Sequence, residues 1–247
     1  MRTVKRKNII TLACAAVLMA AAVSGRSLLM SEGAMPYIKA DAELKVRPEM
    51  PQVVLDAGHG GMDGGCVSVN GVAEKGINLA IVQSESDMLT LLGFETVLTR
   101  DSDKSIYDDG VTGLGEQKKS DMKNRLAIFS STKGIALSIH QNQFTDSRYS
   151  GAQMFYSRRN SGGEKLAAAM QKQFVALLQP DNARETKPVD DELFLLDRTE
   201  APAVMIECGF LSNPEEAAHL EDPVYQRKVA FTIASGVLSF HAGEIGS

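Results

Sequence analysis

The sequence predicts an α/β domain with a largely parallel sheet, and two observations carry the prediction. Short, mostly apolar runs alternate with segments of ten or more residues whose apolar positions recur at helical spacing. About 200 residues follow the N-terminal segment, which is enough chain for one domain with its own core. The composition, 44% hydrophobic and 23% charged, excludes a disordered tail, a collagen-like fibre and a polytopic membrane protein.

The first half of the alternating region predicts two strands and two helices. Residues 52–56 form a short apolar run that ends at an Ala-Gly pair, which is typical of a buried strand. Residues 74–92 carry an apolar stripe at helical spacing and end before a glycine, a common helix stop. Residues 94–98 predict the second strand, and residues 118–131 predict a helix with its apolar side chains on one face.

The second half continues the alternation to the end of the domain. Strands are predicted at residues 135–139, 152–156 and 203–206. A strongly periodic helix is predicted at residues 163–178, stopped by Gln179-Pro180, and an amphipathic helix at residues 223–240. In parallel sheets of this kind, functional sites form at the carboxyl ends of the strands. The residues that follow each strand are therefore the first place to look for chemistry.

The N-terminus has the layout of a secretory signal. Four basic residues within the first seven precede an apolar run at residues 9–23, after which small residues and an arginine follow. This run of 15 residues is shorter than the roughly 20 that span a bilayer. Residues 1–30 are therefore expected to be a signal peptide or an uncleaved N-terminal anchor, residues 31–50 a linker, and residues 51–243 the folded domain. The domain is then expected outside the cytoplasmic membrane.

Charge excludes one class of partner. The first 31 residues hold five of the 26 basic residues and no acidic one, so residues 32–247 carry 21 basic and 31 acidic groups, a net charge of −10. Binding to nucleic acid requires clustered lysine and arginine to meet the phosphates. Nucleic acid is therefore not expected as a partner.

Three predicted strands lead directly into residues capable of catalysis or metal binding. His59 lies in the glycine-rich segment after the first strand, His140 follows the third, and Glu207 follows the strand at 203–206. Glu74 lies at the start of the first helix, where the helix dipole favours an acid. The carboxyl ends of these strands meet at one edge of the sheet, so we expect these four side chains to lie together.

Two imidazoles and one carboxylate suffice for a catalytic zinc site, which keeps a fourth position open for water. We assign His59, Glu74 and His140 as the zinc ligands. Glu207 then remains as a carboxylate near the metal, able to take a proton from water and pass it to a leaving amine.

Each of these residues also has an ordinary structural interpretation. A lone histidine at a strand end is more often a hydrogen-bonded core residue, and Glu74 alone is most often a helix-start acid. Glu207 is harder to explain in this way, because a carboxylate beside an apolar strand has to be paired or functional. The coincidence of four such residues at one sheet edge favours a metal site.

Other catalytic and binding motifs are absent or weak. The Gly58-His59-Gly60 segment lacks the third glycine of a dinucleotide-binding loop, and no phosphate-binding loop or Gly-x-Ser-x-Gly elbow is present. Cys208 is adjacent to Glu207, but alternation along a strand points the two side chains to opposite faces. Cys66 is expected to pack within its loop. The sequence does not show whether these two cysteines pair.

The motifs together resemble a known family. They are Asp56-Ala57-Gly58-His59-Gly60-Gly61, Glu74 with Asn78, Thr99-Arg100-Asp101, Arg125, Ser138-Ile139-His140, and Glu207-Cys208-Gly209-Phe210-Leu211-Ser212-Asn213. In this order, over residues 52–241, they resemble the zinc-dependent N-acetylmuramoyl-L-alanine amidases of the amidase-3 type, which are bacterial wall hydrolases.

The resemblance implies a single domain with a twisted, mostly parallel sheet flanked by helices. It implies a Zn²⁺ ion held by His59, Glu74 and His140, with Glu207 as catalytic acid and base. The reaction would be hydrolysis of the amide between the lactyl group of N-acetylmuramic acid and the L-alanine of the stem peptide. Arg125 is expected either to make substrate or structural contacts or to be an exposed helix arginine.

Two segments resemble one subgroup of this family. Gln141-Asn142 after His140, and Arg184-Glu185-Thr186-Lys187-Pro188, resemble the spore-cortex, germination-type amidases, which prepare the wall for muramic-δ-lactam formation together with a deacetylase. The expected partners are peptidoglycan strands, such a deacetylase and an accessory activator protein, with the membrane contacted only through the N-terminal segment. The expected location is the cell envelope, in particular the forespore envelope.

Two alternative functions remain open from the sequence. One is a catalytically silent wall-binding protein of the same fold, and the other is a zinc hydrolase that acts on another amide, such as a deacetylase. The presence of all four site residues argues against the silent protein.

Overall fold

The structure, a computed structural model, describes residues 50–189 and 191–245. The predicted signal peptide or anchor at residues 1–30 lies outside the described residues, as does all of the predicted linker except Met50. None of the helices in residues 50–189 and 191–245 combines the length and the hydropathy that a transmembrane span requires.

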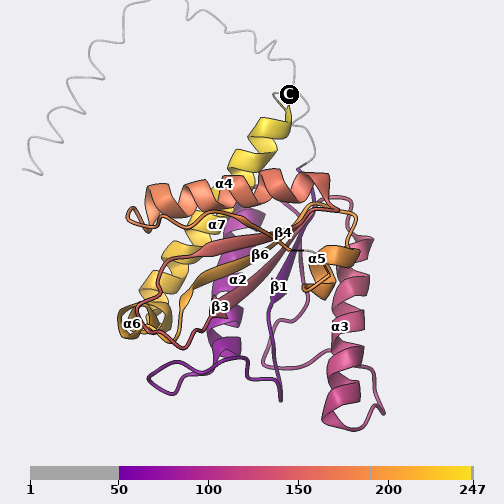
Figure 1. Cartoon of the computed structure of the whole chain (residues 1–247). Coiled ribbons are helices and arrows are strands. Elements are labelled where there is room, and N and C mark those ends of the chain that lie inside the picture. Colours follow the sequence, from indigo (N-terminus) through magenta and orange to yellow (C-terminus); the bar gives the residue numbers. More distant parts are fainter. Residues whose placement is uncertain (1–49, 190, 246–247) are drawn as a thin grey trace, which may run out of the picture. The chain divides into compact units, whose positions relative to one another are not determined.

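A six-stranded sheet with the strand order β2-β1-β3-β6-β4-β5 forms the centre of the domain (Figure 1). The strands are β1 (Val53–Ala57), β2 (Thr96–Leu98), β3 (Ile135–Asn142), β4 (Gln153–Ser157), β5 (Lys187–Val189) and β6 (Ala203–Phe210). β2, β1, β3 and β6 are parallel, whereas β4 pairs antiparallel with β6 and parallel with β5. The expectation of an α/β domain with a mostly parallel sheet is thereby confirmed.

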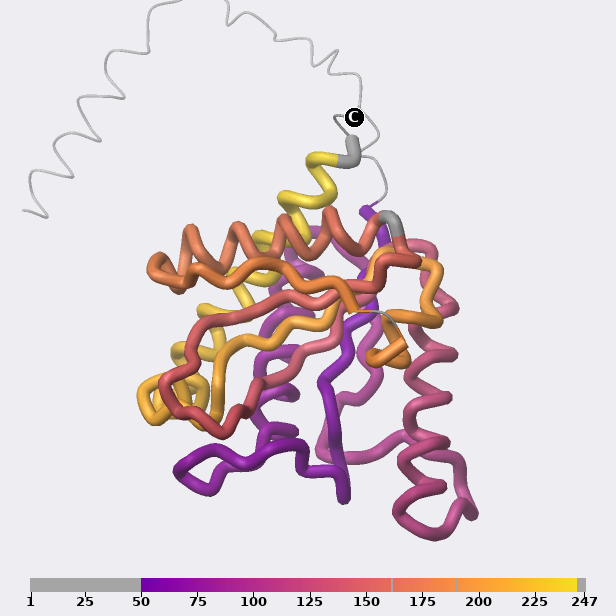
Figure 2. Tube along the Cα trace, viewed as in Figure 1, coloured from indigo at the N-terminus to yellow at the C-terminus, as the bar shows by residue number. Residues whose placement is uncertain are grey.

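Helices cover both faces of this sheet (Figures 1 and 2). They are α2 (Glu74–Leu91), α3 (Leu114–Ser131), α4 (Ser161–Leu177), α5 (Phe194–Arg198), α6 (Pro214–Glu221) and α7 (Pro223–Ile245). α2, α4 and α7 pack on one face over a large apolar cluster that includes Leu55, Leu137 and Ile206. α3 and α5 lie on the other face over a smaller cluster that includes Val54 and Phe129. Covering both faces explains why the first three residues of β1 and of β3 and the first four of β6 are all apolar.

The strands that carry the site extend further than predicted. β3 continues through His140 to Asn142 and β6 continues through Glu207 to Phe210, so these polar residues lie within the strands instead of after them. The parallel pairing of β3 with β6 continues through them, with His140 opposite Glu207, and an irregularity follows before Asn142. Strand pairing is made by backbone groups and does not depend on side-chain polarity. A prediction based on apolar runs therefore places the ends of both strands too early.

Candidate metal centre

Three elements bring His59, Glu74 and His140 together at the carboxyl edge of the sheet. His59 follows β1, Glu74 is the first residue of α2, and His140 lies near the end of β3. The His59 Nε2 atom lies 3.2 Å from Glu74 Oε2, and the His140 Nδ1 atom lies 3.0 Å from Glu74 Oε1. One ligand atom from each residue falls within 4.8 Å of the other two. The structure thus places the three predicted ligands around one point.

The backbone around these side chains is shaped to leave room for them. A Cβ atom on Gly58 would lie 2.3 Å from the His140 ring, and a Cβ atom on Gly65 would lie 2.5 Å from Glu74 Oε2. His59 itself has a φ of 64°, in the left-handed region that non-glycine residues rarely adopt. Strained residues of this kind cluster at functional sites, where the surrounding structure holds them in place.

The Glu74 carboxylate is fixed by donors on every side. It accepts hydrogen bonds from the backbone N–H groups of Cys66 (2.9 Å) and Gln141 (3.0 Å) and from the side chain of Asn78 (3.1 Å). Burial alone would raise the pKa of Glu74, but the hydrogen bonds and charges of His140 and His59 hold it well below its usual range. Glu74 is therefore a negatively charged, immobile group at the centre of the site.

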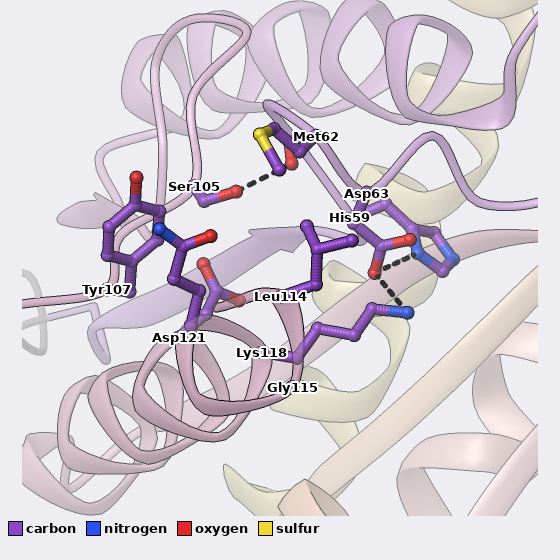
Figure 3. A pocket seen from close by; sticks show the side chains of 11 residues that line it. His59, Met62, Asp63, Ser105, Tyr107, Leu114, Gly115, Lys118 and Asp121 are labelled. Carbon is purple, nitrogen blue, oxygen red and sulfur yellow. Dashed lines mark hydrogen bonds and ion pairs between the residues drawn. The ribbon is translucent and has the colours of Figure 1, made fainter. Parts of the chain in front are cut away.

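Asp63 holds the opposite side of the His59 ring. Its Oδ2 atom lies 3.1 Å from His59 Nδ1 and 3.1 Å from the ammonium of Lys118 (Figure 3). Burial alone would lower the pKa of His59, but Glu74 and Asp63 outweigh burial and raise it. A carboxylate on the second nitrogen of a ligating histidine orients the ring and fixes its tautomer. Asp63 thus leaves Nε2 of His59 directed at Glu74.

The donor set fits a zinc ion. Two imidazole nitrogens and one carboxylate are the ligands of many catalytic zinc sites, and bonds of about 2.0–2.2 Å in tetrahedral geometry place ligand atoms roughly 3.4 Å apart. The His59 and His140 nitrogens lie 3.2 and 3.0 Å from different oxygens of Glu74, and one ligand atom from each residue lies within 4.8 Å of the other two. Three protein ligands also leave the fourth position that a catalytic zinc needs.

Glu207 lies beside these residues in a very different environment. It pairs with His140 in the register of β3 and β6, and its Oε2 atom is buried without a hydrogen-bond partner among the described residues. Burial raises the pKa of Glu207 to about 7, because the opposing charges of the two histidines only partly offset it. A carboxyl group with this pKa is able both to accept and to donate a proton near neutral pH.

A buried ion pair supports the segment that carries His59. The guanidinium of Arg125 contacts Asp56 and Asp121, and it also donates to the backbone carbonyls of Ala57 (3.0 Å) and His59 (2.6 Å). Burial alone would raise the pKa of Asp56, but Arg125 and two hydroxyl groups lower it. The interpretation of Arg125 as an exposed helix arginine is wrong, because its side chain is only 3% exposed. Its role in the structure is to hold the end of β1.

A second buried arginine, Arg100, also supports the site, and the sequence alone predicted no role for it. Arg100 donates to the carbonyls of Ala57 (2.8 Å), Gly58 (3.0 Å) and Lys75 (2.7 Å), so it ties the His59 loop to the start of α2. Arg100 lies two residues after the predicted strand at 94–98, and this position was the available signal. The burial of Arg100 depends on carbonyls distant in sequence, which no local pattern reveals.

The two cysteines of the described region are unpaired. Cys208 is fully buried in the large apolar cluster, as alternation along the strand predicts. Cys66 lies in the loop beside Glu74, and its Sγ atom is 3.5 Å from the carbonyl of Gln141. Burial and the charge of Glu74 raise the pKa of the Cys66 thiol, so it is a poor nucleophile here.

Known proteins similar to this chain identify its family. The sequence pattern of the family described as N-acetylmuramoyl-L-alanine amidase matches residues 53–239. The germination-specific N-acetylmuramoyl-L-alanine amidase of Bacillus subtilis (strain 168) is 34% identical over 189 residues, covering 76% of this chain and 78% of that protein. The amidase AmiA of Escherichia coli (strain K12) is 27% identical over 230 residues, covering 76% of this chain and 75% of that protein.

Solved structures show the same fold. The CwlD amidase from Clostridioides difficile, determined in complex with the GerS lipoprotein, matches with a TM-score of 0.75 and 35% identity, over 78% of this chain and 99% of that one. The catalytic domain of the amidase CwlV from Bacillus (Paenibacillus) polymyxa matches with a TM-score of 0.67 and 30% identity, over 78% and 99% of the two chains. The chain therefore belongs to the amidase-3 family of N-acetylmuramoyl-L-alanine amidases, the enzymes that hydrolyse peptidoglycan at the amide between N-acetylmuramic acid and L-alanine.

Proposed function

We propose that the protein is a zinc-dependent amidase that cleaves the bond between the lactyl group of N-acetylmuramic acid and L-alanine. His59, Glu74 and His140 would hold the zinc ion, and Glu207 would act as general base and then general acid. The observation that carries the proposal is a fixed His-Glu-His group beside the carboxyl group of Glu207, whose Oε2 atom is buried without a partner among the described residues.

Each residue has a defined task in this mechanism. When bound, zinc polarises a carbonyl oxygen and lowers the pKa of water at its open position. Glu207 accepts the proton of the attacking water at a carboxylate oxygen and then delivers it to the departing nitrogen of L-alanine. A pKa of about 7 suits this exchange, since both forms of the carboxyl group are populated near neutral pH. Asp63 holds the His59 ring in position.

We also propose that this amidase acts in the spore cortex. The B. subtilis relative is named as a germination-specific amidase, and it is similar to this chain over most of both proteins. An enzyme of this kind would remove stem peptides from the glycan strand, and a deacetylase would act on the product to allow muramic-δ-lactam to form. The site of action would then be the wall of the developing spore, outside the cytoplasmic membrane.

Delivery to the wall is proposed to depend on the N-terminus and on a partner. Residues 1–30 would serve as a signal peptide or anchor, residues 31–50 as a linker and residues 51–243 as the catalytic domain. The structure of the C. difficile relative is that of a complex with a lipoprotein, which supports an accessory protein for this chain as well.

Product analysis tests the proposed function. The purified protein, with zinc or after chelation, is incubated with peptidoglycan, and the products are examined by mass spectrometry. We expect zinc-dependent release of stem peptides with free L-alanine amino termini. Release of acetate instead would indicate a deacetylase, and binding without any product would indicate a silent wall-binding protein.

A further inference from the structure

Two hollows flank the candidate metal centre. One, of about 390 Å³, borders His59 and is walled by the apolar side chains of Met62, Leu114 and Tyr107 (Figure 3). The other, of about 310 Å³, borders both His59 and His140 and reaches α5. Four residues line both hollows and so form the partition between them: His59, Asp63, Lys118 and Asp121.

Lys118 is the exposed cation of this partition. Its ammonium lies 3.1 Å from Asp63 Oδ2, and its side chain is 65% exposed. An ammonium has three N–H donors, so donors remain for a ligand after the contact with Asp63 is made. The other cation that lines either hollow, Arg125, is buried and bound to Asp56 and Asp121.

The anions of the partition are already engaged with the protein. Asp121 accepts from Arg125 at 2.6 Å and from the backbone N–H of Ile106 at 2.7 Å. Asp63 accepts from Lys118 and from the backbone N–H of Gly65 and contacts the ring of His59. These carboxylates have their charge satisfied, whereas Lys118 lines both hollows and keeps donors beyond the one directed at Asp63. A carboxylate in either hollow would find its complementary charge there.

The net negative charge of the chain makes Lys118 a distinctive contact for an anionic group. Residues 32–247 have a net charge of −10, so the surface as a whole repels an anionic peptide. The scissile amide joins a sugar to a peptide, and the two must leave the metal centre in different directions. Two hollows meeting beside His59 offer a path for each, and Lys118 borders both paths.

We propose that Lys118 is a specificity-determining residue that binds a carboxylate of the stem peptide close to the L-alanine. This inference rests on the proposed amidase function and assigns a substrate contact within it. Removal of the ammonium should weaken recognition of a stem peptide with a free carboxylate and leave recognition of its neutral amide nearly unchanged.

Paired substrates test this contact. N-acetylmuramoyl-L-alanyl-D-glutamine carries a free α-carboxylate, and N-acetylmuramoyl-L-alanyl-D-glutaminamide carries the neutral amide at the same position. Neither compound has a free γ-carboxylate. The measured quantity is the ratio of kcat/KM for the acid to that for the amide, on zinc-loaded wild type, Lys118→Gln, Lys118→Arg and Lys123→Gln. Lys123 is the matched control, since it is exposed on the same helix and lines neither of the two hollows. Zinc content is measured for every variant, because Lys118 touches the residue that orients His59.

We expect wild type to prefer the acid by about three- to fivefold, which is the contribution of an exposed ion pair. Lys118→Gln should lose this preference with its zinc content unchanged, while Lys118→Arg and Lys123→Gln should keep it. A ratio of one in wild type, or an undiminished ratio in Lys118→Gln, would overturn the proposal. Should wild type cleave neither substrate, the proposed function fails, and calorimetric binding of the same two compounds then decides on Lys118 by the same ratio.

Discussion

The start of α2 and the end of β6 each bring a glutamate to the same sheet edge, in opposite surroundings. Glu74 accepts hydrogen bonds from two backbone N–H groups and one amide side chain and contacts two imidazoles. Glu207 has a buried oxygen without any partner among the described residues. The pKa of Glu74 lies well below its usual range, and that of Glu207 is raised to about 7.

This difference assigns the two carboxylates to different tasks. A ligand must be charged and immobile, which its hydrogen-bond donors ensure. A proton carrier must change its charge during the reaction, which a full set of donors to the ionised form would prevent. The two environments push the pKa values apart, and this separation distinguishes acid–base residues from ligands at other active sites.

Substitution of Glu207 is expected to have the largest effect. Glu207→Gln and Glu207→Ala should lower the amidase kcat by roughly 10²–10⁴-fold, the contribution of a positioned general acid–base group. The matched control is Glu200→Gln, at an exposed position before the opposite end of β6. The rate is followed as release of new L-alanine amino termini, and full activity of Glu207→Ala would show that another group carries the proton.

Substitution of Arg125 tests Asp56, a buried carboxylate that is paired with a cation and is not a proposed zinc ligand. Arg125→Met leaves Asp56 buried without its cation, so the free energy of unfolding should fall by about 3–5 kcal/mol. Urea unfolding of the zinc-free protein measures this loss, with Lys123→Met on the exposed side of α3 as the control. A loss below about 1 kcal/mol, the range of an exposed ion pair, would mean that the pair does not support the β1 edge.

Glu85 is a buried carboxyl group outside the candidate site, so it shows the effect of burial alone on a pKa. It is fully buried on α2, both oxygens lack partners among the described residues, and burial raises its pKa well above the usual value of 4.5. Above pH 4.5 the folded chain retains this proton while the unfolded chain loses it, so stability falls as pH rises, by roughly 1.4 kcal/mol per pH unit for one proton.

Glu85→Gln should remove this part of the pH dependence. Denaturant unfolding at pH 5 and pH 7 compares wild type, Glu85→Gln and the exposed α2 control Asp87→Asn. The predicted result is a smaller decrease in stability between the two pH values for Glu85→Gln alone. An unchanged decrease would show that Glu85 ionises in the folded protein as readily as in the unfolded one.

Local pattern was sufficient to predict most of the fold. Apolar runs and helical stripes predicted the central strands and the long helices, because these segments bury continuous apolar surface. β5, α5 and α6 were missed, since three, five and eight residues are too few to show a clear period. The antiparallel direction of β4 was also missed, because strand direction depends on the path of the chain and leaves no mark in a single strand.

The site was predictable only in part. The assignment of His59, Glu74 and His140 as ligands and Glu207 as base came from their positions next to strands and a helix start, and it stays a prediction that the geometry supports. The supports of these residues could not be predicted in this way. Arg100 and Arg125 act on partners up to 69 residues away, which are defined only by the fold. Asp63 is only four residues from His59, but their contact depends on the left-handed backbone of His59.

The zinc content of two matched variants tests the central claim most directly. Glu74→Gln and Glu207→Gln each replace one buried carboxylate at the same sheet edge by the neutral amide of equal size. After equilibration with zinc and removal of unbound metal, Glu207→Gln should retain one zinc per chain and Glu74→Gln should retain clearly less. Equal zinc loss in both variants, or full retention by Glu74→Gln, would contradict the assignment of Glu74 as ligand and Glu207 as proton carrier.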